Sequence, residues 1–187
     1  MDLKSQLIET STSLFQQKGY KSVGLNEILK ACNVTKGALY HHFPNGKEEL
    51  LITCLHGLNE TITADIEAIF SRHSSTEGAI LSMIDKLTHD FEKNGTIIGY
   101  TFSSIVSEMA TMSEPVRTAC NALYENIQHL YYEKLITEGY SNESASAFAL
   151  LMTASIEGAM MLCLTQKSAE PLNTIAILLP NILKANK

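Results

Sequence analysis

The chain has 187 residues, 45% of them hydrophobic, and carries a formal net charge of −6 at pH 7. This is enough chain to bury a sizeable core, either in one domain or in a small domain followed by a larger one. No apolar run approaches the length of a membrane span and no signal peptide precedes the predicted fold. We therefore expect a soluble cytoplasmic protein without a membrane partner.

The charge is distributed unevenly along the chain. Residues 1–50 hold six Lys/Arg and five Asp/Glu, a balance of +1, whereas residues 51–187 hold eight and fifteen, a balance of −7. Only the N-terminal part is therefore suited to approach a polyanion such as DNA. Because +1 is a modest charge, DNA affinity must come from well-aimed donors and from dimerisation rather than from bulk charge.

The pattern of residues 3–43 predicts three short helices. The first covers residues 3–18 and ends at Gly19, because glycine favours the backbone conformation that follows a helix. The other two flank a tight turn at Asn33, since asparagine tolerates the left-handed conformation, and Thr35 is a good N-cap for the last one. The apolar positions that recur at helical spacing are Leu7, Ile8, Leu14, Phe15, Leu25, Ile28, Leu29, Leu39 and Phe43.

The outward face of the helix after Thr35 suits a DNA groove. Gly37 and Ala38 are small enough to let the start of this helix approach base edges, and Lys36 can donate to a base or to a phosphate. A helix, a tight turn and a second helix in a groove form the helix-turn-helix arrangement. The residues predicted to contact DNA are Asn26, Thr35, Lys36, Gly37, Ala38, Tyr40, His41, His42 and Lys47.

A break at Pro44-Asn45-Gly46 separates this region from a longer helix that starts at Lys47. Lys47 is either a phosphate contact at the start of that helix or an ordinary solvated lysine. The helix is the expected lever between DNA binding and the rest of the chain. The ranges predicted to be helical after the break are 47–70, 76–93, 101–112, 113–138, 141–165 and 171–184.

From Leu7 to Leu50 the sequence resembles the N-terminal DNA-binding domain of the TetR family of bacterial repressors. The residues that carry the resemblance are Leu7-Ile8, Leu14-Phe15, Gly19-Tyr20, Ile28, Val34-Thr35-Lys36-Gly37, Leu39-Tyr40, His42-Phe43 and Lys47-Glu48-Glu49-Leu50. The run from Phe43 to Lys47 is similar to the branch that includes lincomycin-resistance regulators. That branch has one residue more between the Phe and the Lys than most of the family.

The resemblance implies an all-α protein of two domains. Residues 1–46 would form a three-helix helix-turn-helix domain that binds a double-stranded DNA operator, and residues 47–187 a larger helical ligand-binding and dimerisation domain. Three departures from the family pattern are Thr10-Ser11 for two alanines, Asn33 for a frequent glycine and Ala38 for a frequent threonine. We expect the first two to be structural substitutions and the third to affect base reading.

The predicted helix over residues 141–165 is apolar nearly all round, and the last one, over residues 171–184, has few charges. A helix with two apolar faces is buried on both sides, either in a thick monomer core or between two subunits. We expect a homodimer, because an exposed patch of this size is an aggregation hazard and a palindromic operator needs two-fold symmetry. The predicted interface residues are Leu151, Ser155, Gly158, Leu162, Ile175, Leu179 and Ile182.

Methionines and aromatic residues gather in the C-terminal part, and the resemblance implies an effector pocket there. Taken singly, each is better explained as plain core; as a set they favour a small apolar or aromatic effector. Glu157, in the most apolar stretch, is either a carboxylate hydrogen-bonded at the subunit interface or a polar anchor for the ligand. The predicted pocket residues are Leu55, Leu58, Met83, Leu87, Phe102, Val106, Met109, Tyr124, Ile127, Met152, Ile156 and Met160.

The sequence contains no pattern typical of an enzyme. There is no Gly-rich phosphate loop, HExxH or nucleophile elbow, so we predict no catalytic residue, metal or cofactor. The four cysteines have no CxxC spacing and are expected to be free and mostly buried, with a thiol redox sensor as the alternative. We predict a repressor that an apolar effector releases from a palindromic operator. The alternative is a small-molecule-binding helical protein without DNA activity.

Overall fold

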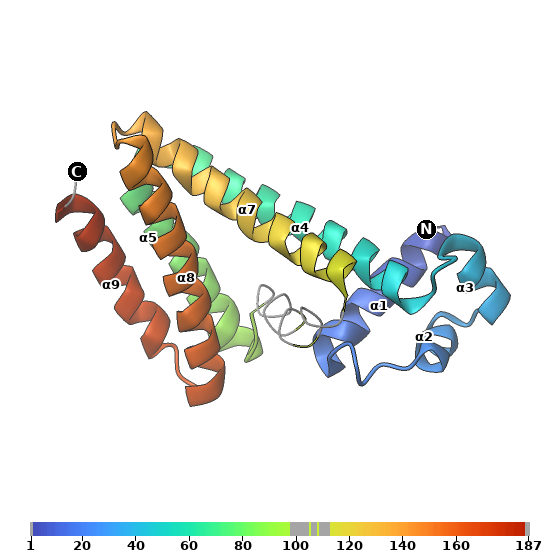
Figure 1. The fold of residues 1–187 in the computed structure, drawn as a ribbon. Helices are drawn as coiled ribbons and strands as arrows, with labels where there is room; N and C mark the ends of the chain where they lie inside the picture. The colour runs from blue at the N-terminus through green and yellow to red at the C-terminus, as the bar shows by residue number, and fades with distance from the viewer. Residues whose placement is uncertain (1, 98–104, 106–107, 109–112, 186–187) are drawn as a thin grey trace. The chain divides into compact units, whose positions relative to one another are not determined.

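The computed structural model describes residues 2–97, 105, 108 and 113–185, and these residues form helices and connecting turns without a strand (Figure 1). The predicted all-α fold class is therefore confirmed. The helices are α1 (Leu3–Lys18), α2 (Leu25–Cys32), α3 (Lys36–His42), α4 (Lys47–Arg72), α5 (Thr76–Asn94), α7 (Glu114–Thr137), α8 (Asn142–Gln166) and α9 (Glu170–Ala185). Of the helix expected over residues 101–112, Ile105 and Glu108 are helical and the rest lies outside the described residues.

The described residues group into two compact units. The first contains residues 1–61 and 101–122, and the second contains residues 62–100 and 123–187, as far as they are described. Both α4 and α7 continue from one unit into the other. The division after residue 46 that the sequence suggests concerns the roles of the two parts rather than their compactness, and it stays a prediction.

Local sequence signals set the ends of most helices. At the start of α1 the Asp2 carboxylate accepts a hydrogen bond from the Ser5 N–H (2.7 Å), which lowers the pKa of Asp2. Ser75 and Ser141 cap α5 and α8 in the same way, and Gly95 ends α5 in the left-handed conformation (φ 67°). The described helices consequently begin and end within two residues of the bounds predicted for them.

The second unit is built from α5, α8 and α9, with the later parts of α4 and α7. α9 packs against both α8 and α5. The Tyr140 hydroxyl donates to the Leu183 carbonyl oxygen (2.9 Å), and the Glu138 carboxylate accepts hydrogen bonds from the N–H and the hydroxyl of Thr76. These bonds fix the end of α7 against the start of α5 and the end of α9.

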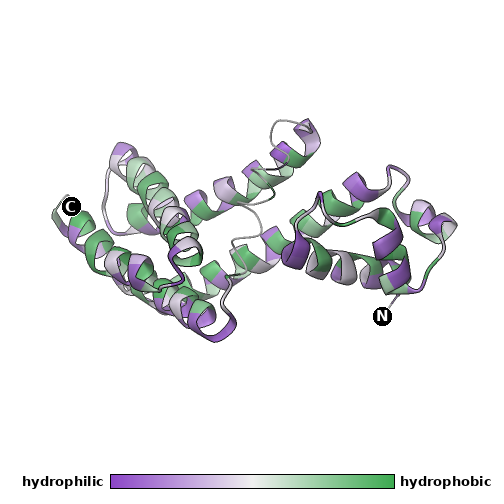
Figure 2. Cartoon of the chain, turned by 90° about the horizontal axis from the view of Figure 1, so that it is seen from below, coloured by the Kyte–Doolittle hydropathy of each residue, from purple (hydrophilic) through white to green (hydrophobic). Residues whose placement is uncertain are grey.

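α8 is long and apolar enough, by length and composition alone, to cross a membrane. The expectation that no apolar run approaches this length is therefore wrong, because too few charged residues interrupt the helix. A single such helix is weak support for a membrane segment, since a core helix of a soluble protein meets the same test. The buried residues of α8 are Ala145, Ala149, Met152, Thr153, Ile156, Ala159, Met160 and Cys163. Figure 2 shows hydrophobic residues predominating along the C-terminal helix as well.

All four cysteines are free and buried, which confirms the prediction of buried thiols; they are Cys32, Cys54, Cys120 and Cys163. Burial raises the pKa of Cys54 to about 11 and that of Cys120 to about 11. Both thiols therefore keep their protons at neutral pH, whereas the thiolate is the form that reacts. Neither position has the lowered pKa that a thiol redox sensor requires.

Ser11 occupies a position where the resembled family usually has alanine. The residue is fully buried in α1 (0% exposed), and its hydroxyl has no hydrogen-bond partner among the described residues. A buried hydroxyl without a partner lowers the stability of the folded state by about 1–3 kcal/mol, because it has lost its hydrogen bonds to water without gaining others. Serine is therefore less favourable than alanine at this position, because its hydroxyl adds no hydrogen bond.

We expect Ser11→Ala to raise the free energy of unfolding by about 1 kcal/mol, because it removes the unbonded hydroxyl and leaves the packing of the Cβ unchanged. Guanidinium denaturation followed by circular dichroism measures the change. Ser13→Ala, at an exposed position of the same helix, is the control and should change the value little. A destabilised Ser11→Ala variant would show that the hydroxyl has a partner after all.

Candidate DNA-binding site

The turn between α2 and α3 fixes the direction of α3. Asn33 ends α2 in the left-handed conformation (φ 54°, ψ 46°), as its position in the sequence predicts. The Val34 N–H then donates to the Leu29 carbonyl (3.0 Å), and the Thr35 hydroxyl accepts a hydrogen bond from the Ala38 N–H (3.2 Å). Both ends of the turn are thereby tied to a helix, and α3 starts in a defined direction.

Two buried side chains hold α3 in place. The helix has only seven residues, and a helix this short is unstable on its own. Leu39 is 0% exposed and Phe43 is 1% exposed, so both reach the core of the first unit. The predicted inward positions are thus correct, and the opposite face of α3 is held rigidly toward solvent.

The side chains predicted to contact DNA lie mostly on this open face. Exposed members are Asn26, Thr35, Lys36, Gly37, Tyr40 and His41, and partly buried members are Ala38 and His42. The structure brings Lys36 and Tyr40 together, with the lysine Nζ 5.6 Å from the centroid of the tyrosine ring. The His41 and His42 rings lie 5.1 Å apart, edge to face. α2 and α3 therefore present amines, hydroxyls and imidazoles side by side, which suits phosphates and base edges.

The loop from α3 to α4 is closed by two hydrogen bonds. The Gly46 N–H donates to the Phe43 carbonyl oxygen, and the Asn45 N–H donates to Glu49 Oε2, each at 2.8 Å. Gly46 has a φ of 70°, a conformation that glycine adopts without strain. The loop is consequently a defined turn, as its Pro-Asn-Gly sequence predicts.

Lys47 is engaged within the first unit. Its Nζ donates to the Tyr20 carbonyl oxygen and lies 3.8 Å from the centroid of the Tyr20 ring. Burial lowers the pKa of Lys47, and the charge of Glu108 opposes this shift. The residue is therefore not the freely solvated lysine of one sequence interpretation. Its role as a phosphate contact stays a prediction, and that role requires the ammonium to leave Tyr20.

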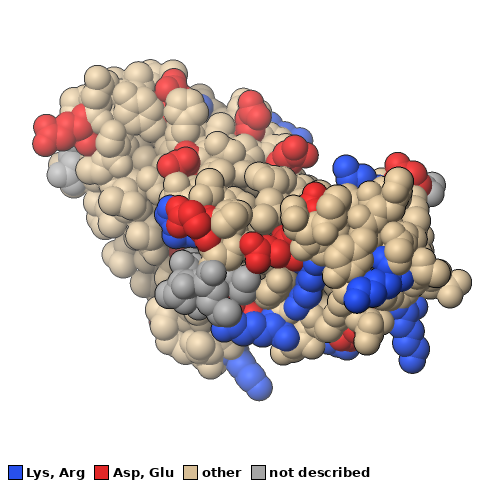
Figure 3. All heavy atoms as spheres, turned by 45° about the vertical axis from the view of Figure 1, so that its right-hand side comes forward, with Lys and Arg blue, Asp and Glu red and all other residues tan. Residues whose placement is uncertain are grey.

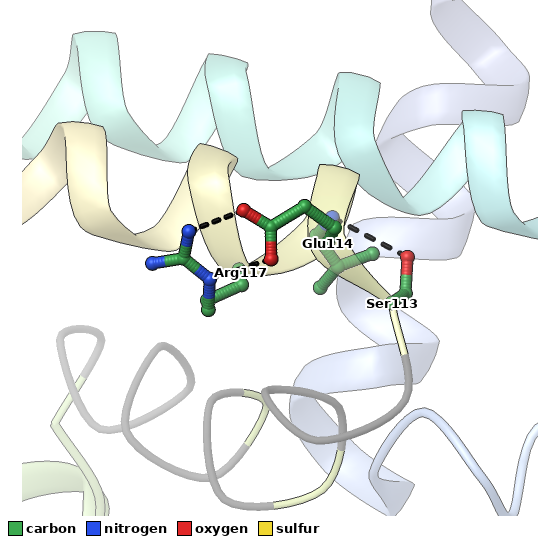
Figure 4. A network of polar contacts seen from close by, with 4 residues as sticks. Ser113, Glu114 and Arg117 are labelled. Atoms are coloured by element: carbon green, nitrogen blue, oxygen red, sulfur yellow. Dashed lines mark hydrogen bonds and ion pairs between the residues drawn. The ribbon is translucent and has the colours of Figure 1, made fainter.

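Two polar contacts connect the turn between α1 and α2 and the start of α4 with residues much later in the chain. Glu108 Oε2 accepts a hydrogen bond from the Lys21 N–H (3.1 Å), and the Ser113 hydroxyl donates to Glu48 Oε1 (2.7 Å). Figure 4 shows Ser113 at the start of α7, next to the ion pair of Glu114 with Arg117. Neither contact was predicted, because no local sequence pattern relates residues so far apart in the chain.

Cationic side chains are prominent around the N-terminal helices. Figure 3 shows them on the part of the molecule that includes residues 1–61, with acidic side chains among them. One of the acidic residues, Glu27, pairs with Lys18 at 2.5 Å, which lowers the pKa of the glutamate. The surface is therefore mixed rather than strongly basic, in agreement with the charge balance of the sequence.

The predicted pocket residues fall into three groups. Phe102, Val106 and Met109 lie outside the described residues. Leu55 and Leu58 belong to the first unit. The remaining seven belong to the second unit, and those that are buried there are Met83, Ile127, Met152, Ile156 and Met160, while Leu87 and Tyr124 are partly buried.

A buried polar cluster lies within the second unit. The Tyr131 hydroxyl donates to the Met83 sulfur (3.3 Å), and the Tyr131 ring stacks on Phe70 with centroids 5.1 Å apart. Burial raises the pKa of Tyr131, and the charge of Glu157 adds to the shift. Glu157 therefore acts on an interior hydroxyl. Tyr131 belongs to the set of methionines and aromatic residues that favours an apolar effector, although it was not among the predicted pocket residues. Phe70 was predicted only as the end of the helix over residues 47–70.

The residues predicted at a subunit interface differ in exposure. Exposed members are Leu151, Gly158, Leu162 and Ile182, and partly buried members are Ser155 and Ile175. The prediction that Leu179 lies at the interface is corrected, because the residue is only 2% exposed. It lies on the same face of α9 as Leu172 and Leu183 and packs inside its own chain. Large apolar side chains that the prediction omitted are also exposed on α8 and α9, namely Leu150, Met161, Ile177 and Leu178.

Comparison with known proteins gives the chain a family. Residues 7–54 match the description "Bacterial regulatory proteins, tetR family", and residues 76–177 match "Transcriptional regulator LmrA/YxaF-like, C-terminal domain". The chain belongs to the TetR family. Membership confirms the resemblance noted in the sequence, including the branch to which the loop after α3 points.

Two relatives from Bacillus subtilis (strain 168) match nearly the whole chain. The uncharacterized HTH-type transcriptional regulator YxaF is 34% identical over 183 residues, 98% of this chain and 96% of its own. The HTH-type transcriptional regulator LmrA is 33% identical over 98% of this chain and 97% of its own. This TetR-family member is therefore a transcriptional regulator with an N-terminal DNA-binding domain and, as predicted, not an enzyme.

Solved structures share the fold of this TetR-family chain. Reduced NemR from E. coli covers 97% of the chain with 96% of its own, at a TM-score of 0.84 and 24% identity. A TetR transcriptional regulator from Legionella pneumophila covers 97% with 97% of its own, at a TM-score of 0.81 and 22% identity. At these identities the likeness concerns the arrangement of helices.

Proposed function

We propose that this TetR-family regulator is a cytoplasmic homodimeric repressor that leaves a palindromic operator when a small, largely apolar effector binds. The observation that carries the DNA-binding part is the open face of α3, held toward solvent by Leu39 and Phe43. The α3 helices of two subunits would enter successive major grooves about 34 Å apart. Residues 1–46 would bind DNA, and residues 47–187 would bind the effector and the second subunit.

We expect the protein to retain specific sequences from a pool of random duplexes, and two substitutions on α3 to weaken that binding differently. Lys36→Ala should lower affinity and, if Lys36 reads a base, relax the preference at one position. Tyr40→Phe should lower affinity evenly across sequences by about 1 kcal/mol, as the loss of one phosphate hydrogen bond would. Fluorescence anisotropy with the selected operator measures both effects.

Lys93→Ala removes the same charge from an exposed position on α5 and is the matched control for Lys36→Ala. Equal binding by the parent and both α3 variants would mean that α3 is not the reading helix. If the pool yields no retained DNA, the alternative function, a small-molecule-binding helical protein without DNA activity, is the better explanation.

The exposed apolar side chains on α8 and α9 support the homodimer. Leu150 is 57% exposed, Leu162 is 48% exposed and Ile177 is 67% exposed, although these helices already bury another face within the chain. A thick monomer core would not leave such side chains in water. Covering them with the same helices of a second copy, around a two-fold axis, removes this apolar surface from solvent.

We expect Gly158→Leu to weaken the dimer, because the exposed face of α8 near Gly158 would meet the partner. Within the chain a Cβ at this position would meet nothing within 4 Å, which favours contact with another molecule as the cause of a loss. Gly57→Leu, in α4, has the same open surroundings and is the control. Analytical ultracentrifugation gives the dissociation constants; a parent that sediments as a monomer at micromolar concentration would contradict the proposal.

The second unit contains buried apolar residues and a few polar groups that suit an apolar effector. Met83 and Tyr131 form a polar contact in surroundings that are otherwise apolar, and Glu157 acts electrostatically on the same hydroxyl. Methionine adapts to guests of different shape, and a few polar groups fix orientation. The effect of Glu157 on Tyr131 is compatible with both of its predicted roles, a polar anchor for the ligand and a carboxylate at the subunit interface.

The route from effector to DNA is proposed to run through Glu108 and Ser113 as well as along α4. Both residues belong to the compact unit that contains the DNA-binding helices, and they bind the Lys21 N–H and Glu48. An effector that favours a state without these two bonds would free the N-terminal helices to change their spacing. A ligand shifts such an equilibrium only by its difference in affinity for the two states.

We expect a compound that releases the operator to bind more weakly, by the same factor, to the protein–DNA complex than to free protein. Calorimetric titration with and without operator measures both affinities. Met152→Trp, which fills space in the second unit, should reduce the affinity for the compound and leave operator binding largely intact. Equal affinities in the two titrations would mean that this ligand does not act on DNA binding.

A further inference from the structure

We propose that the aromatic ring of Tyr40 is a positioning group that holds the Lys36 ammonium for DNA, and that Gly46 is the seat of this ring. The inference rests on the proposed DNA-binding role of α3. It gives Tyr40 a task that is separate from any hydrogen bond its hydroxyl makes to a phosphate.

The seat is formed by the loop between α3 and α4. Gly46 is buried, and a Cβ built on it would lie 3.2 Å from the Tyr40 hydroxyl oxygen and 3.4 Å from two ring carbons. The 3.2 Å distance is tighter than ordinary van der Waals contact, so a side chain at residue 46 would push the Tyr40 ring away by a few tenths of an ångström. The backbone of Gly46 is fixed in turn by its N–H bond to the Phe43 carbonyl oxygen (2.8 Å).

The Tyr40 ring also lies close to Lys36. The two residues are one helical turn apart, and the lysine Nζ lies 5.6 Å from the ring centroid, within the range of a cation–π contact. An exposed lysine otherwise samples many rotamers, and DNA binding must order it. Because the Tyr40 ring packs against Gly46, its position is restricted, and the ring in turn restricts the rotamers of Lys36 before DNA binds.

Gly46 lies in a run of unusual length. The run Phe43-Pro44-Asn45-Gly46-Lys47 has one residue more than most of the resembled family. In this run a glycine with a φ of 70° lies against the side chain of Tyr40.

A double-mutant cycle on operator binding tests the positioning role. Lys36→Met removes the charge and keeps the length, Tyr40→Leu removes the ring, and Tyr40→Phe keeps the ring without the hydroxyl. We expect the effects of Lys36→Met and Tyr40→Leu on Kd to couple by about 2- to 5-fold. Lys36→Met and Tyr40→Phe should be additive. Additive effects for the leucine pair, or equal coupling for the phenylalanine pair, would overturn the proposal.

Two glycines provide a matched test of the seat. Gly46→Ala and Gly95→Ala both place a side chain at a similar backbone conformation, with φ of 70° and 67°. Nothing lies within 4 Å of a Cβ at Gly95, whereas a Cβ at Gly46 meets Tyr40. We expect similar losses of thermal stability, but weaker operator binding only for Gly46→Ala. Equal operator binding by the two alanine variants would show that Gly46 is no seat.

A measurement without DNA separates this proposal from the proposed function. In the free protein the ring current of residue 40 should shift the Cε–Hε resonance of Lys36 in the parent and in Tyr40→Phe, and the shift should vanish in Tyr40→Leu. A parent that shows the shift but retains no DNA would contradict the function and not the geometry. Operator binding without this shift would overturn the positioning role alone.

Discussion

The DNA-binding part depends on fixing a helix that is too short to fix itself. α3 has seven residues, and the first turn of a helix costs more than its single hydrogen bond returns. Its stability and direction therefore come from outside: the left-handed residues Asn33 and Gly46 on either side, and the buried Leu39 and Phe43 beneath. What the open face presents follows from these four positions, because they leave no freedom to rotate the helix about its axis.

This rigidity matters because the N-terminal part of the chain has little net positive charge to attract DNA. The N-terminal fifty residues carry a balance of only +1, and Lys47 donates to the Tyr20 carbonyl, where burial lowers its pKa. A protein with a weak long-range electrostatic field gains affinity for DNA from the number and orientation of its hydrogen-bond donors. The proposed dimer would double those donors, and donors held in position before binding lose less conformational entropy when DNA binds.

The sequence predicted what repeats locally and missed what is distant. Helical spacing and capping residues placed the described helices, and Asn33 and the Pro-Asn-Gly loop marked the turns around α3. The contact of Glu108 with the Lys21 N–H has no local signature, and the exposure of Leu179 depended on which face of α9 meets α8. The contact of Tyr40 with Gly46 could not be predicted either, since the sequence of a turn that contains glycine does not show whether an aromatic ring packs against it.

The proposed coupling between effector and DNA can be compared with the contacts that would carry it. Allosteric coupling in proteins is about 1–3 kcal/mol, and one net hydrogen bond contributes about 1 kcal/mol. The bonds from Glu108 to the Lys21 N–H and from Ser113 to Glu48 would together supply an energy of this size. Neither bond alone reaches the upper part of the range. An effector that is to abolish operator binding must therefore break both or also tilt α4, which is why the proposed route uses the two contacts together with the long helix.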